Sequence, residues 1–159
     1  YYHFGSKEGL YAAVLEFAYR IVREDHIDPP KDLPPLQALA RFAGYAFDNF
    51  SKYPDFIRLS LQENLQGARF LKESTTIVEM NRATLTVVQD IVQRGLADGS
   101  IRQGIDPMNV YINFIGLCHY HISSRHNYQV LFDYDSSLPA NSQSRRASIC
   151  DAIIRYVQS

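Results

Sequence analysis

The sequence predicts an all-α fold, a single-domain helical bundle of about six helices. Apolar residues recur at the three- and four-residue spacing of amphipathic helices. Proline and glycine divide the chain into segments of helical length. No segment that alternates polar and apolar residues is long enough to argue for a sheet. A chain of 159 residues has the size of one domain with its own core.

The first predicted helix runs from Lys7 to about Asp25. Ser6 is placed to cap it, because a serine oxygen accepts a hydrogen bond from a free amide of the first turn. Glu8 lies where the positive end of the helix dipole favours a carboxylate. One face of this helix carries apolar residues at helical spacing: Leu10, Val14, Phe17, Ala18 and Ile21.

Two more helices are predicted over residues 34–52 and 54–66. Residues 28–35 contain four prolines and predict a stiff loop, since each proline disfavours the α conformation in the residue before it. Pro54 separates the two helices and is well placed to begin the second. The helix over 34–52 presents one apolar face, made of Leu36, Leu39, Ala43, Ala46, Phe47 and Phe50.

The rest of the chain predicts helices over residues 69–97, 107–124 and 143–159, with a short helical turn at 128–133. Asp98 and Gly99 end the first of these. Asp106 caps the next, with Pro107 at its first position. Residues 135–144 are polar, small and proline-containing, so they predict a loop.

The opening residues, Tyr1 to Leu10, form an aromatic-rich turn that runs into the first predicted helix. This stretch resembles the end of the helix-turn-helix of TetR-family transcriptional regulators, where the recognition helix gives way to the helix that leads to the sensor domain. The spacing of NF-x-x-YP, EN-x-x-G and GSIRQGIDP resembles the layout of the sensor domains of that family over nearly the whole chain. The resemblance implies that residues 1–6 end a DNA-binding domain mostly missing from this chain. Residues 7–159 are then an effector-binding and dimerisation domain, with 7–25 as the connecting helix.

The resemblance assigns contacts with operator DNA to Tyr1, Tyr2, His3 and Lys7, with Tyr2 and Phe4 also holding the turn. A lysine beside free amides at a helix N-terminus independently suits an external phosphate. The alternative is that the aromatic residues only pack and that Lys7 is a solvated charge. The formal net charge of −1 gives no basic footprint for nucleic acid, so the DNA-binding surface is expected largely outside this chain.

An effector pocket is predicted where polar residues fall on apolar helix faces. A few convergent polar groups in an apolar wall are typical of small-molecule sites. With plausible aromatic walls included, the expected residues are Tyr45, Phe47, Phe50, Ser60, Glu63, Asn64, Asn81, Thr84, Tyr111 and His121. The alternative is that each polar group is satisfied within the fold, as most buried polar groups are. For His121 a core position is favoured over a ligand contact.

A dimer interface is predicted from the wide apolar arcs of the helices over 107–124 and 143–159, which one neighbour does not cover. In the TetR family two such helices from each subunit form a four-helix interface. The expected contacts are Phe114, Ile115, Cys118, Ala147, Cys150, Ile153, Ile154 and Val157. The alternative is a terminal helix buried within a larger monomeric core.

Several chemistries are excluded on the sequence. No nucleophile elbow or phosphate loop is present, so we expect neither an enzyme nor a cofactor. His119 and His121 point about 200° apart on a helix and do not chelate one ion, so no metal is expected. Two cysteines without close-spaced partners, no signal peptide and no long apolar run predict a cytoplasmic protein with no membrane partner.

The expected function is that of a ligand-responsive, DNA-binding transcriptional regulator, a repressor of the TetR type that acts as a homodimer. One alternative is a constitutive or co-repressed regulator with a fully packed core, which would have no cavity near Asn64 and Asn81. The other is a helical-bundle small-molecule carrier or enzyme without DNA-binding function. The sequence leaves the identity of the small-molecule effector and of the operator open.

Overall fold

The computed structural model describes residues 3–158, and within that range the chain forms seven α-helices and one 3-10 turn. The all-α prediction is therefore confirmed. The elements are α1 (Lys7–Glu24), α2 (Pro35–Lys52), α3 (Pro54–Leu65), η1 (Leu71–Glu73), α4 (Thr75–Asp98), α5 (Pro107–Ser123), α6 (Arg125–Phe132) and α7 (Pro139–Val157).

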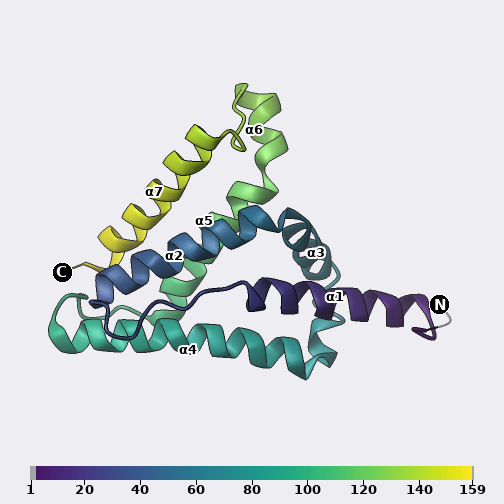
Figure 1. Ribbon diagram of the computed structural model, residues 1–159, viewed down its shortest axis with the longest axis horizontal. Coiled ribbons are helices and arrows are strands. Elements are labelled where there is room, and N and C mark those ends of the chain that lie inside the picture. The colour runs from purple at the N-terminus through teal and green to yellow at the C-terminus, as the bar shows by residue number, and fades with distance from the viewer. Residues whose placement is uncertain (1–2, 159) are drawn as a thin grey trace.

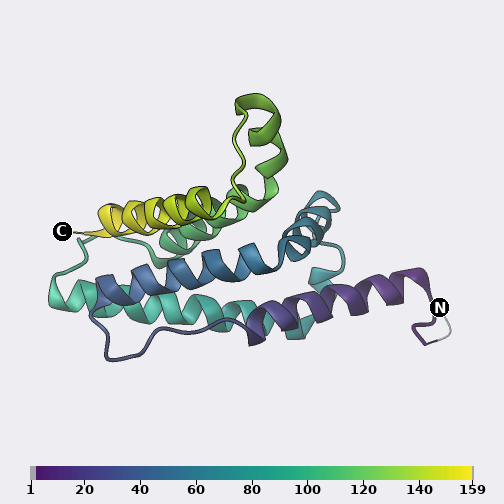
Figure 2. The same ribbon diagram turned by 45° about the horizontal axis from the view of Figure 1, so that its top comes forward.

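Helix α2 lies in the middle of the molecule, between α4 on one side and α7 on the other (Figures 1 and 2). Helix α5 packs against α2, α4 and α7, whereas α1 lies beside α4 and contacts α3. The N-terminal end of α1 extends beyond the bundle, and α6 projects away from it at the opposite face (Figure 2). This arrangement gives α2 ten buried residues and α1 only two.

The predicted helix over 69–97 begins later than expected, at Thr75. Gly67 and Ala68 both have positive φ, +70° and +58°, so the backbone turns sharply after α3 before it enters η1. Ser74 then caps α4, since its side-chain oxygen accepts a first-turn amide at 3.2 Å. The sequence prediction missed this turn because alanine carries no signal for a left-handed conformation.

The end of the chain also differs from the prediction. Helix α7 begins at Pro139 and not near residue 143, because the fixed φ of proline suits the first helical position. Helix α6 spans Arg125–Phe132, longer than the turn predicted at 128–133, and ends at Asp133 with φ of +50°. No helix among residues 3–158 combines the length and apolarity needed to cross a membrane.

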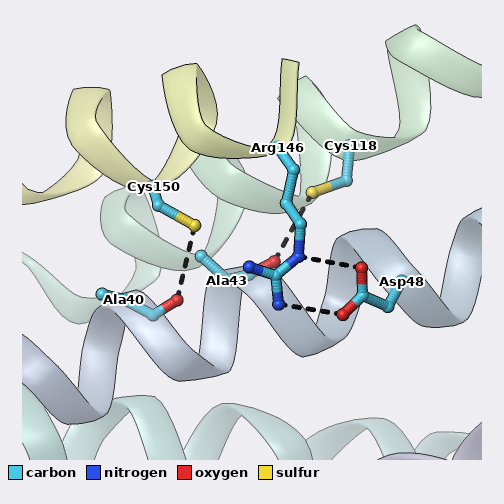
Figure 3. Close-up of polar contacts among 6 residues, drawn as sticks. All are labelled: Ala40, Ala43, Asp48, Cys118, Arg146 and Cys150. Carbon is cyan, nitrogen blue, oxygen red and sulfur yellow. Dashed lines mark hydrogen bonds and ion pairs between the residues drawn. The ribbon is translucent and has the colours of Figure 1, made fainter. Parts of the chain in front are cut away.

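Close packing of α2 against α5 and α7 depends on small residues of α2 (Figure 3). The Cys150 thiol donates to the Ala40 carbonyl at 3.5 Å, and the Cys118 thiol approaches the Ala43 carbonyl at 3.9 Å. Arg146 of α7 forms a two-point ion pair with Asp48 of α2, with both N–O distances 2.9 Å. Helix α2 is therefore in close contact with both α5 and α7.

Gly95→Ala should destabilise the fold. A Cβ at Gly95 would lie 3.0 Å from Ile101 Cβ and closer still to the end of that side chain. Ile101 is 1% exposed and its amide donates to the Gly95 carbonyl at 3.0 Å, so it has no room to retreat. We expect the free energy of unfolding, measured with urea, to fall by about 1–3 kcal/mol.

Gly44→Ala is the matched control in a second buried helix. There the new Cβ meets the guanidinium of Arg146 at 2.6 Å, which is the flexible end of a half-exposed side chain. Loss of the exposed Arg146–Asp48 ion pair lowers the free energy of unfolding by about 0–1 kcal/mol. Alanine favours the helix over glycine by about as much, so we expect little net change in stability. Equal losses of stability in the two variants would contradict this account of the packing.

Candidate functional site

A cavity of about 70 Å³ lies between the C-terminal half of α1 and helices α2, α3, α4 and α5. On the same measure one water needs roughly 10–15 Å³, so the cavity has room for a small ring. Its walls are mostly apolar and aromatic: Tyr19, Val22, Phe42, Ala46, Phe50, Phe56, Met80, Tyr111 and Ile115. The polar lining residues are Arg23, His26, Asn49, Asn81 and Thr84. A wider surface depression shares Tyr19, Asn81 and Tyr111 with it.

Four residues of the predicted pocket line this cavity: Phe50, Asn81, Thr84 and Tyr111. The Asn81 side-chain amide donates to the Ile77 carbonyl at 2.9 Å, and the Thr84 hydroxyl donates to the Met80 carbonyl at 3.1 Å. Asn81 is exposed and lies where the cavity meets the surface depression, whereas Thr84 is half-buried. Both side chains thus keep an oxygen that can accept a hydrogen bond.

Glu63 was predicted to lie in the effector pocket, but it does not line the cavity, and its carboxylate is bound within the fold. It is fully buried, and its Oε1 accepts the Phe70 and Leu71 amides at 2.6 and 3.1 Å. Its Oε2 accepts the Tyr11 hydroxyl at 3.0 Å. The pKa of Tyr11 is raised, mainly by burial and then by this hydrogen bond with Glu63. Glu63 therefore fastens the turn between α3 and α4 to α1.

Ser60, Asn64 and Tyr45 also lie outside the cavity wall. Asn64 is exposed near the end of α3, and Tyr45 is half-buried on α2. Burial raises the pKa of Tyr19, and a hydrogen bond with Ser60 opposes that shift. Ser60 therefore supports a cavity residue without lining the cavity itself.

Phe47 and His121 pack against each other away from the cavity, with ring centroids 4.9 Å apart. His121 is 5% exposed. The pKa of His121 is lowered, mainly by desolvation and then by the positive charge of nearby Arg145, so the ring is neutral at pH 7. The core position favoured for His121 on the sequence therefore agrees with its surroundings. No group of three potential metal-ligating side chains comes together within residues 3–158.

The sequence analysis missed the polar residues contributed by the end of α1 and by α2. Asn49 is 7% exposed, and its amide donates to the Val22 carbonyl at 2.7 Å. His26 packs edge-on against Phe42 with ring centroids 4.8 Å apart, and desolvation lowers its pKa below the ordinary value. The helical spacing of Asn49 with Phe42, Ala46 and Phe50 is the signal that could have placed it on the cavity wall.

The end of the chain assigned to DNA contact is exposed. His3 and Lys7 are both on the surface, and Ser6 caps α1 by accepting the Gly9 amide at 3.0 Å. Tyr1 and Tyr2 lie outside the described residues. The same end of α1 exposes large apolar side chains: Phe4, Leu10, Val14 and Phe17.

Four residues of the predicted dimer interface are instead buried within the single chain. Phe114, Cys118, Ile153 and Val157 are each at most 2% exposed, so they have no surface to offer a partner. Helices α2 and α5 cover the inner face of α7, which accounts for much of its wide apolar arc. Ile115, Cys150 and Ile154 are half-buried, and Ala147 is exposed.

Exposed apolar surface remains on the outer side of α5. Ile112 and Tyr120 are 55% and 57% exposed, and Gly116 lies between them on the same face of the helix. A Cβ added to Gly116 would have no other atom within 4 Å. The positions 112, 116 and 120 are successive turns of one face. Residues 112, 116 and 120 therefore leave an apolar stripe on the outer side of α5 uncovered within the single chain.

Comparison with known proteins identifies the fold family. The sequence model of the family described as tetracyclin repressor-like, C-terminal domain, matches residues 35–153, about three quarters of the chain. The chain is also similar to the HTH-type transcriptional repressor NicS of Pseudomonas putida KT2440, with 30% identity over 127 residues. The match covers 79% of this chain and 60% of that relative, so the chain spans about 60% of the relative's length. The chain belongs to the TetR family, as a tetracyclin repressor-like C-terminal domain.

Proposed function

We propose that this chain is the effector-binding and dimerisation part of a ligand-responsive TetR-type repressor that acts in the cytoplasm. The observation that carries the proposal is the aromatic cavity, because the last turns of α1 form one of its walls. Family membership and the similarity to a transcriptional repressor support a regulatory role.

The cavity and the proposed DNA-contact residues belong to the two ends of one helix. Tyr19, Val22 and Arg23 contribute to the cavity, while Lys7 begins the same helix. An α-helix of 18 residues is roughly 27 Å long and moves as a rod. A ligand that displaces the cavity end of α1 therefore displaces its DNA end. The ligand can shift the equilibrium between the two positions of α1 only by as much as its affinities for the two states differ.

The homodimer is a second part of the proposal. The exposed stripe of Ile112, Gly116 and Tyr120 on α5, with Ala147 on α7, is the surface we assign to the partner subunit. A two-fold axis there would fix the separation of two DNA-binding domains. Matching half-sites on DNA are spaced by about 34–36 Å or multiples of it.

The exposed apolar face at the start of α1 favours this function over a carrier or enzyme without a DNA-binding domain. Phe4, Val14 and Phe17 are 46–60% exposed and line one surface depression. A cluster of this kind marks an interaction surface. A DNA-binding domain that rests on this face would receive the movement of α1 directly.

Thr84→Phe should uncouple the response without preventing DNA binding, because a larger side chain would occupy the cavity. The full-length protein with this change should bind its operator like the wild type. Release by an effector, chosen by a thermal-shift screen of metabolites, should need at least about tenfold more ligand. Fluorescence anisotropy of a labelled operator measures both quantities.

Thr86→Phe is the matched control. Thr86 lies on the same helix, is exposed, and donates to its own helix at 3.0 Å as Thr84 does at 3.1 Å. It should respond to the effector like the wild type. Identical loss of response in the two variants, or tight operator binding by a monomer, would refute the proposal.

Ile112→Asp should weaken the dimer, since it places a charge in the centre of the α5 stripe. We expect the dimer dissociation constant, measured by sedimentation equilibrium, to rise at least about tenfold. Ile27→Asp is the control, because Ile27 is similarly exposed, at 59%, but lies in the loop after α1. If the Ile112 variant stays as dimeric as the Ile27 variant, the partner surface lies elsewhere.

A further inference from the structure

Three polar residues on the cavity wall, Asn49, Asn81 and Thr84, share one property: each already uses a side-chain donor within the fold. The Asn49 amide donates to the Val22 carbonyl, the Asn81 amide to Ile77, and the Thr84 hydroxyl to Met80. Each of these side chains retains acceptor capacity on its oxygen. At these three positions the wall offers an acceptor oxygen, which a donor group on a ligand would match.

The orientation of Asn49 is fixed by the end of α1. The Val22 carbonyl lies in the last turn, where helix carbonyls lack partners, and the His26 amide bonds to Arg23 instead. The Asn49 amide nitrogen fills this gap at 2.7 Å. The opposite orientation of the amide would place its oxygen against the carbonyl oxygen, so Oδ1 faces away from Val22.

Asn49 Oδ1 is buried and has no hydrogen-bond partner in the described part of the chain. The residue lines the cavity and is 7% exposed, so a group that pairs with this oxygen has to come from the cavity side. An unpaired buried acceptor is unfavourable, and a donor brought by a ligand relieves that cost. The flexible side chain of Met80, on the same cavity wall, lets the site adjust around an incoming group.

The other cavity groups restrict the rest of the ligand. Five aromatic rings surround the space: Tyr19, Phe42, Phe50, Phe56 and Tyr111. A volume of about 70 Å³ suits a small ring. The charge of Arg23 is balanced by Asp28 at 3.5 Å, so the wall has no unpaired charge to bind an ion.

We propose that the cavity binds small uncharged aromatic molecules that carry an O–H or N–H group, with that group donating to Asn49 Oδ1. The inference rests on the proposed function, since it specifies the ligand class of the same site. It also connects ligand and signal, because Asn49 holds the Val22 carbonyl at the end of α1.

Phenol and toluene are the probes that test this inference, because they have nearly the same shape and differ in the donor. Isothermal titration of the full-length protein should give phenol at least about tenfold tighter binding than toluene, although toluene is the more hydrophobic molecule. Asn49→Leu should reverse this preference, while Asn109→Leu, at an exposed position on α5, should leave it unchanged.

A second measurement uses only the wild-type protein, so it tests the inference even if the Asn49→Leu variant does not fold. In ¹⁵N NMR spectra of the wild type, phenol should shift the side-chain amide signal of Asn49, and toluene should shift it much less. Wild-type protein that prefers toluene, binds neither probe, or shows equal shifts with both would overturn the inference. Operator binding by the same preparation tests the regulator proposal separately, because it does not depend on which probe binds.

Discussion

The hydrogen bond from the Asn49 amide to the Val22 carbonyl, 2.7 Å long, joins the end of α1 to the central helix α2. The contact lies in the cavity wall, between the last turn of α1 and α2, and it fixes which way the Asn49 oxygen faces. In the proposed function, the same contact would link a bound ligand to the helix that bears Lys7.

The two helices joined by this bond differ in how firmly they are held. Helix α2 has ten buried residues, and small side chains let α5 and α7 pack closely against it (Figure 3). Helix α1 buries only Leu15 and Val22 and packs against α3 and α4. Elements with few buried contacts open or shift at lowest free-energy cost. We therefore expect a ligand between them to move α1 and to leave α2 in place.

The sequence predicted the helices from caps, prolines and apolar spacing, which are local signals, but it did not predict which neighbour covers each face. Glu63 was placed correctly on an apolar face, yet its oxygens accept the Phe70 and Leu71 amides of a turn that the sequence did not reveal. The burial of Phe114 and Ile153 shows the same limit, since a helical wheel does not count the neighbours supplied by one chain. Asn49 was missed because its role depends on a carbonyl 27 residues away.

The central claim is that filling the cavity moves α1 relative to α2. Electron–electron double resonance between spin labels at the exposed position 8, beside Lys7 in the two subunits, measures this movement most directly. The account predicts that a cavity ligand shifts the distance distribution in the wild type but not in a protein whose cavity is filled by Thr84→Phe. An unchanged distance in wild-type protein that the ligand has released from its operator would contradict it.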